Sequence, residues 1–378
     1  MTFYLLFYLI NILLAFIADK YYEKNKAISV VLLAIVVLIH TFVIGLRDIG
    51  VGIDTGVYIE SYCNDAISTR NFHDFITSSH DLGYLLLSIV CVKIVPLPQS
   101  LLAGTEFFVI LFFILGMWNY RKIYLINIGV MFTMFCFMYS MHTLNLMRQS
   151  CALSLLFYSF SLFLQAKKGS YLIFQIVACF FHATAFFFVV VPLFYYIASI
   201  ESRKLRYLAI LGVVILLVAS INSYYTIVEI VGNISPFEDY SENYGSESQF
   251  AANGFSHLSL RSTITTIFLV IVLFRCKNKH ILDDDNNERM FFFMMLLYLS
   301  STIIIQYLPT IMKYAGRIGY YILVIWMVYY TRLLSNKHVP LSVSSLLFFV
   351  DVFWEWYMGF IVYNGGEVVP FRSFILGL

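Results

Sequence analysis

Five short motifs place charged, amide and imidazole side chains beside glycine and tyrosine in an otherwise apolar chain. They are Arg47-Asp48-Ile49-Gly50-Val51-Gly52-Ile53-Asp54-Thr55 followed by Tyr58, Asp81-Leu82-Gly83-Tyr84, Asn145-Leu146-Met147-Arg148-Gln149, Phe181-His182, and Arg317-Ile318-Gly319-Tyr320. A guanidinium group binds a phosphate or carboxylate through two parallel hydrogen bonds. An imidazole titrates near neutral pH and can act as a general base. These residue types suit chemistry on a phosphate or pyrophosphate group.

Structural roles explain single members of this set, because an arginine at a helix end often extends to the membrane interface. A lone histidine in an apolar helix is also usually a satisfied interior group. Three arginines at helix ends, Arg47, Arg148 and Arg317, are harder to explain in this way. Burying an arginine costs about 2.5–3.5 kcal/mol on insertion scales, so an anion should compensate. Asp54 or Asp81 could do so, and a bound pyrophosphate would do so better.

The composition shows which elements must position these residues. Of the 378 residues, 61% are apolar and only 12% are charged, against about 25% charged in soluble proteins. The mean hydropathy is +0.83, so the bilayer must solvate most of the chain.

The net charge is only +2, without a long basic run, which argues against a nucleic-acid partner. The six cysteines form no CxxC or Cys/His pair with metal-ligand spacing, so we expect no metal site.

The apolar runs predict an all-α, polytopic membrane protein with about 10–13 transmembrane or re-entrant helices. A spanning helix needs about 20 mostly apolar residues. The runs that qualify, or nearly so, are 3–18, 27–46, 101–118, 124–143, 147–165, 205–221, 261–275, 290–308, 317–334 and 341–361. We expect the whole chain, 1–378, to form a single integral-membrane domain.

Two apolar stretches fit poorly as single spans. Residues 82–96 are too short and end in Pro96 and Pro98, so we expect a re-entrant segment. Residues 171–200 would form a helix of about 45 Å, against a hydrocarbon core of about 30 Å. We expect a hairpin of two short helices there, with His182 near its apex.

The positive-inside rule then orients the chain. With the N-terminus outside and both irregular segments as described, 16 of the 24 lysines and arginines face the cytoplasm. The two largest outer segments are residues 47–81 and 222–260. This topology brings all five motifs to the outer face of a bacterial inner (plasma) membrane, where we expect an active site that faces the periplasm.

The same motifs, in the same order, resemble the EpsG family of Wzy-type exopolysaccharide and O-antigen polymerases. The resemblance covers about residues 1–335 and rests on the motifs from Arg47 to Arg317 quoted above. It implies a GT-C-like glycosyltransferase that acts on glycans linked to undecaprenyl pyrophosphate. It also implies a chain-length regulator and a flippase as partner proteins, and no cofactor.

Such a transfer needs two kinds of help from the protein. Its leaving group is already good, so the enzyme must stabilise growing negative charge and deprotonate an acceptor hydroxyl. Arginines can do the first without a metal, and His182 or Asp54 can do the second. We therefore take His182, Asp54 and Arg148 as candidate catalytic residues. The candidate substrate-binding residues are Arg47, Arg317, Tyr58, Asn145, Gln149 and Asp81.

Two other functions remain open on sequence grounds. A lipid-linked oligosaccharide flippase or other transporter also needs cations in a membrane cavity, but we would expect repeat symmetry and charges along a central path. A membrane O-acyltransferase also uses an intramembrane histidine, but its histidine must reach an acyl donor from the cytoplasm. The clustering of charges at one face favours the polymerase.

Overall fold

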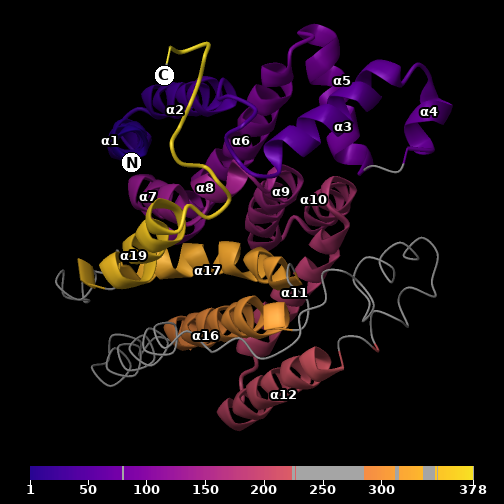
Figure 1. Ribbon diagram of the computed structural model, residues 1–378. Helices are drawn as coiled ribbons and strands as arrows, with labels where there is room; N and C mark the ends of the chain where they lie inside the picture. Colours follow the sequence, from indigo (N-terminus) through magenta and orange to yellow (C-terminus); the bar gives the residue numbers. More distant parts are fainter. Residues whose placement is uncertain are drawn as a thin grey trace. The chain divides into compact units, whose positions relative to one another are not determined.

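The computed structural model describes residues 1–78, 81–223, 226, 285–310, 315–334, 345–346 and 348–377. Within these ranges all regular structure is helical, without a strand, as Figure 1 shows. The prediction of an all-α protein is therefore confirmed. The predicted span at 261–275 and the outer segment 222–260, apart from its first residues, lie outside the described ranges, as does part of 341–361.

The chain divides into two compact units. Unit 1 comprises Met1–Phe186 together with Tyr330–Leu378, and unit 2 comprises Phe187–Tyr329. The prediction of a single membrane domain stays a prediction.

Unit 1 contains four of the five sequence motifs. Its helices are α1 (Thr2–Tyr22), α2 (Lys26–Gly45), α3 (Thr55–Ser68), α4 (Phe72–Ile76), α5 (Leu82–Ile94), α6 (Pro98–Tyr124), α7 (Ile128–Met138), α8 (Ser140–Thr143), α9 (Met147–Leu164) and α10 (Lys168–Phe181), followed near the C-terminus by the helical turns Phe348–Phe353, α19 (Trp354–Trp356) and Tyr357–Val362. Unit 2 contains α11 (Val190–Ala198), α12 (Arg203–Asn222), α16 (Asp285–Tyr307), the 3₁₀ turns Leu308–Thr310 and Ala315–Ile318, and most of α17 (Gly319–Leu334). The 3₁₀ segment Ala183–Val189 crosses the boundary between the units.

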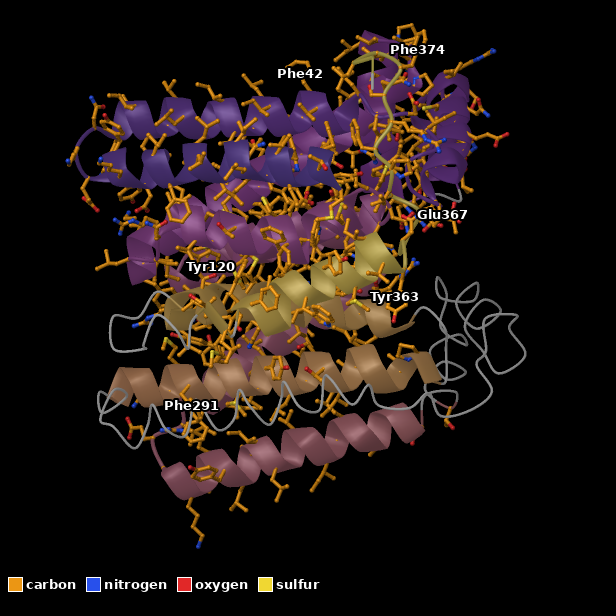
Figure 2. The ribbon with its side chains drawn as sticks, turned by 60° about the vertical axis from the view of Figure 1, so that its left-hand side comes forward. Phe42, Tyr120, Phe291, Tyr363, Glu367 and Phe374 are labelled. Atoms are coloured by element: carbon orange, nitrogen blue, oxygen red, sulfur yellow. The ribbon has the colours of Figure 1, made fainter. Side chains whose placement is uncertain are left out.

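Three described helices, α1, α2 and α6, are long and apolar enough to cross a membrane by length and composition. Inside a bilayer the helix satisfies its own backbone groups, which is why such apolar runs become helices. The side chain of Phe42 on α2 is 57% exposed and points away from unit 1 in Figure 2, as expected of a lipid-facing residue. These three helices confirm a membrane protein.

Small residues let the helices of unit 1 approach closely. Gly45 on α2 lies against Ala103 on α6, where an added Cβ would be 2.4 Å from the Ala103 Cα. Gly116 on α6 likewise faces the ring of Phe157 on α9. Because lipid tails are as apolar as leucine, close backbone approach is a main source of helix association in membranes.

The structure corrects one predicted span. The run 124–143 is broken into α7 and α8, because Tyr139 leaves the helical conformation with φ −125° and ψ −32°. The start of α7 is fixed by Asn127, whose side chain accepts a hydrogen bond from the Val130 amide. At eleven residues, α7 is about 17 Å long.

Both irregular stretches form short helices, as their lengths predict, while the re-entry of 82–96 and the hairpin of 171–200 stay predictions. Helix α5 has 13 residues, about 20 Å, and is too short to cross a bilayer. Helix α10 ends at Phe181, and His182 is extended with φ −162° and ψ 116°. The Gln175 side chain donates to the Ala185 carbonyl at 3.1 Å, although a straight helix would separate these residues by about 15 Å. The predicted break at His182 is therefore confirmed.

Candidate functional site

Three helix ends meet in unit 1 at the residues that the motifs singled out. Asp81 precedes α5, Arg148 lies in the first turn of α9, and His182 follows the last residue of α10. Gly83 allows this approach, since an added Cβ would lie 2.9 Å from the carbonyl carbon of Phe180. The sequence motifs thus become neighbours although they are up to about one hundred residues apart.

Arg148 and Asp81 form the central ion pair of this site. Arg148 Nη1 lies 2.6 Å from Asp81 Oδ2 and also donates to Tyr62 Oη at 3.2 Å. The guanidinium carbon lies 5.0 Å from the ring centre of Tyr58 and 5.8 Å from that of Tyr62, within the range of cation–π attraction. The side chains of Arg148 and Asp81 are 28% and 19% exposed, so a ligand can reach them.

His182 lies near the same carboxylate oxygen. Its Nδ1 lies 3.8 Å from Asp81 Oδ2, and its side chain is 23% exposed. This distance is too long for a hydrogen bond, but a protonated imidazole would be attracted to the carboxylate. Asp81 Oδ2 is therefore shared between a guanidinium and an imidazole.

Tyr62 was not singled out from the sequence. It follows Tyr58 by four residues, so both rings lie on one face of α3. Burial raises the pKa of Tyr62 to about 12, so its hydroxyl stays protonated at neutral pH. A tyrosine pair at this spacing beside an aspartate-rich segment is the signal that could have found it.

Arg47 has a different environment from Arg148. Its side chain is fully buried, and Nη1 donates to the Ile44 carbonyl at 3.0 Å and to Glu106 Oε1 at 3.4 Å. Nη2 donates to the Leu144 carbonyl at 3.1 Å and contacts Met147 Sδ at 3.7 Å. The sequence suggested direct contact with substrate, but Arg47 has no exposed area for one in this structure.

Glu106 is the buried partner of Arg47. It lies on α6 with no exposed side-chain area and accepts a hydrogen bond from Thr143 Oγ1 at 3.3 Å. Tyr84 lies between the buried Arg47–Glu106 pair and the Arg148–Asp81 pair. Its hydroxyl contacts Thr105 Oγ1 at 3.0 Å and Met147 Sδ at 3.7 Å. Its ring packs edge-on against Tyr62, with centres 4.9 Å apart.

The segment Gly52 to Thr55 is locked onto the start of α9. The Asp54 amide donates to Asn145 Oδ1 at 2.8 Å, and Thr55 Oγ1 contacts the Leu144 carbonyl at 3.0 Å. Gly52 has φ +100°, and an added Cβ would lie 2.5 Å from Thr55 Oγ1. Only glycine fits both the backbone conformation and the space. The Asp54 side chain is half-buried at the start of α3.

Gln149 and Arg317 are the two other predicted residues. Gln149 is buried on α9, with only 4% of its surface exposed. Arg317 is half-buried in the 3₁₀ turn before α17, in unit 2. The expectation that Arg317 shares one cavity with Arg47 and Arg148 therefore stays a prediction. In the described part of the chain, no three His, Cys, Asp or Glu side chains gather as a metal site would require.

Fold and site together define an α-helical membrane protein with a charged and aromatic site where several helices end. The model of the EpsG family matches residues 30–373, nearly the whole chain. The chain belongs to the EpsG family. No curated protein and no solved structure matches it. Membership supports a role as a membrane polysaccharide polymerase in general.

Proposed function

We propose that the chain joins undecaprenyl-pyrophosphate-linked oligosaccharide repeat units at the outer face of the bacterial inner membrane. The growing glycan leaves its lipid pyrophosphate and is attached to a sugar hydroxyl of an incoming lipid-linked unit. The observation that carries this proposal is the meeting of Arg148, Asp81 and His182 at a partly exposed point over two tyrosine rings. A cation for the leaving group and a base for the acceptor are then neighbours.

The reaction needs no redox step. The acceptor oxygen forms a bond to the anomeric carbon, the bond from that carbon to the phosphate oxygen breaks, and the acceptor proton passes to a base. The electron pair leaves with the pyrophosphate. Negative charge therefore grows on the phosphate oxygen, where a positioned cation stabilises the transition state. Inversion at the anomeric carbon by direct attack is the simplest outcome.

Arg148 is our candidate for this cation. Its Nη1 is held by one carboxylate oxygen and one hydroxyl. Its Nε is buried and has no hydrogen-bond partner among the described residues. A phosphate can replace Asp81 as the ion-pair partner of Arg148. It can also accept a hydrogen bond from Nε, so that the guanidinium binds it in the bidentate manner that it favours. The rings of Tyr58 and Tyr62 hold the guanidinium in place during this exchange.

His182 is our candidate for the base, with Asp81 as its partner. When the pyrophosphate takes Arg148, the Asp81 carboxylate is released from its ion pair. It already lies 3.8 Å from His182 Nδ1, so a small movement brings it into hydrogen-bond range. It then stabilises the imidazolium that forms when the other ring nitrogen takes the acceptor proton. Asp54 is the alternative base.

The remaining predicted residues have supporting roles in this proposal. Arg47, with Glu106, supports the backbone at Leu144 and acts as a positioning residue. Asn145 holds the amide of Asp54 in place. We keep Gln149 and Arg317 as candidate contacts to the lipid-linked glycans. A flippase and a chain-length regulator are the partner proteins that such a polymerase would need.

The test uses purified protein in lipid vesicles with an undecaprenyl-pyrophosphate-linked repeat unit, and polymer is measured on a gel. Wild-type protein should form polymer, and His182→Ala should slow the reaction by about 10²–10⁴-fold. His73→Ala is the matched control, because His73 is an exposed histidine of the same outer region. Near-normal polymer from His182→Gln would move the base role to Asp54. Wild-type protein that forms no polymer would refute the proposed function.

A further inference from the structure

The C-terminal segment of unit 1 runs beside a loop from the first fifth of the chain. We call residues 364–374 the strap and residues 46–54 the Arg47 loop. In Figure 1 the yellow strap passes the end of α2, and in Figure 2 Glu367 and Phe374 both lie on it, at the opposite end of the unit from Tyr120. The Asp48 amide donates to the Arg372 carbonyl at 2.9 Å, and the Phe374 amide donates to Asp48 Oδ1 at 2.9 Å.

The strap also holds the loop where it approaches the site. The Gly52 amide donates to the Glu367 carbonyl at 3.1 Å, and the Ile53 amide donates to the Gly366 carbonyl at 2.8 Å. The next amide, that of Asp54, donates to Asn145 Oδ1 at 2.8 Å. Three successive amides are thus fixed, two by the strap and one by a side chain of the site.

The strap is itself anchored to α1. Tyr4 Oη donates to the Val368 carbonyl at 2.6 Å, and the rings of Phe3 and Phe371 stack with centres 4.0 Å apart. Asn364 and Glu367 adopt φ +47° and +54°, which L-amino acids other than glycine rarely do. Such a conformation persists where the surroundings determine it strongly.

A glycine brings the strap against the site residue. Gly366 has φ +78°, and an added Cβ would lie 3.3 Å from Asn145 Nδ2. Asn145 is three residues before Arg148 and next to Leu144, whose carbonyl accepts from Arg47 Nη2 and contacts Thr55 Oγ1. The strap, the Arg47 loop and the start of α9 therefore form one hydrogen-bonded assembly.

We propose that the strap is a positioning element of the active site. The main-chain carbonyls of Gly366 and Glu367 set the conformation of the Arg47 loop and thereby the placement of Asp54 and Asn145 relative to Arg148. The effect on activity rests on the proposed function, whereas the effect on the loop does not. The Glu367 carboxylate has no part in this role.

Two glycines of the C-terminal region provide a matched pair of variants. Gly366→Ala and Gly377→Ala both force alanine into a positive φ, +78° and +69°, but only Gly366 faces a neighbour within 4 Å. We expect polymer formation to fall about 10–100-fold in Gly366→Ala, because small displacements of positioned groups have effects of this size. Gly377→Ala should match the wild type. Equal activity of the two variants would overturn the proposal.

A second pair of variants tests whether the main-chain carbonyl or the side chain of Glu367 has the positioning role. Glu367→Gly keeps the carbonyl and accepts the positive φ without strain, and Glu367→Gln keeps the shape but removes the charge. Both variants should retain activity within about twofold of the wild type. A loss beyond tenfold in both would assign the role to the carboxylate and overturn the main-chain role.

Amide hydrogen exchange of the purified protein tests the loop directly. Peptides that cover residues 46–54 should exchange at least tenfold faster in Gly366→Ala than in Gly377→Ala, while peptides of α6 should not change. Unchanged exchange in the loop would overturn the strap proposal even if activity fell. If the wild type formed no polymer, only the proposed function would fail, and the exchange result would still decide whether the strap holds the loop.

Discussion

Two of the arginine–carboxylate pairs in unit 1, Arg47 with Glu106 and Arg148 with Asp81, differ in their surroundings. Arg47 and Glu106 are fully buried, with Nη1 and Oε1 3.4 Å apart. Arg148 and Asp81 are 28% and 19% exposed, with Nη1 and Oδ2 2.6 Å apart. The two pairs are close, because Met147 contacts Arg47 and directly precedes Arg148. The same pair of functional groups thus occurs in two settings within a short distance.

The number of partners explains what each pair can do. Arg47 is bound to two carbonyls, a carboxylate and a thioether, which come from three separate parts of the chain. A ligand would have to replace all of them inside the bundle. Arg148 has one carboxylate oxygen, the hydroxyls of Tyr62 and Tyr58, and the two ring faces of these tyrosines. An anion can replace the carboxylate without unfolding anything, so burial separates a structural arginine from an exchangeable one.

The largest effect should follow from breaking the buried pair. Arg47→Leu or Glu106→Leu alone leaves one uncompensated charge in the bundle, which should lower the free energy of unfolding by about 3–5 kcal/mol. The double variant Arg47→Leu with Glu106→Leu should be less destabilised than either single variant. Unfolding in detergent micelles measures this double-mutant cycle. Simple additivity of the two single effects would show that the pair is not coupled.

Substitutions in the partly exposed pair, Arg148 and Asp81, should affect activity more than stability. Arg148→Ala should reduce polymer formation by about 10²–10³-fold, and Arg148→Lys should also lose much of it because lysine lacks the bidentate fork. The free energy of unfolding should change less than in Arg47→Leu, because both side chains of this pair are partly exposed. Arg70→Lys, at an exposed arginine between α3 and α4, is the control. Normal polymer from Arg148→Lys would contradict bidentate binding of phosphate.

The smallest effect concerns the hydroxyl of Tyr62. Tyr62→Phe removes the hydrogen bond from Arg148 but keeps the ring, so we expect a loss of activity of only a few-fold, about 1 kcal/mol.

Because burial raises the pKa of Tyr62 to about 12, its contribution to stability should be complete below about pH 10. It should be lost as the pH rises through about 12. The wild type should therefore lose stability relative to Tyr62→Phe only above pH 10, and a difference between their pH profiles at lower pH would contradict this assignment.

Much of the fold follows from apolar patterning. The run 27–46 is α2 (Lys26–Gly45), and the run 147–165 is α9 (Met147–Leu164). The run 124–143 was wrong as one span because hydropathy does not register where the backbone leaves the helix. Asn127 caps α7, and Asp19, more than one hundred residues earlier, accepts from the Ile128 amide at 3.0 Å. Such a distant partner leaves no periodic signal in the sequence.

Most members of the candidate site were predictable from the sequence, and so was a carboxylate partner for an arginine, but not Tyr62 or the partner of Arg47. The motifs identified Asp81, Arg148 and His182 by residue type, and the structure brings these three together. Nothing in the sequence indicated that Glu106 pairs with Arg47, because the two are 59 residues apart and both lie in apolar surroundings. The strap escaped notice for another reason: it acts mainly through backbone carbonyls, which every residue has.

The strap also has a consequence for how the protein is made. Its Ser373 hydroxyl donates to the Leu46 carbonyl, across 327 residues. At about 5–20 residues per second, a ribosome needs roughly 16–65 s to synthesise the intervening chain. For most of that time the Arg47 loop has left the ribosome, whereas its hydrogen-bond partners in the strap have not yet been synthesised. A nascent chain that lacks residues 364–374 therefore cannot carry a finished site, so activity should begin only after the strap has been synthesised.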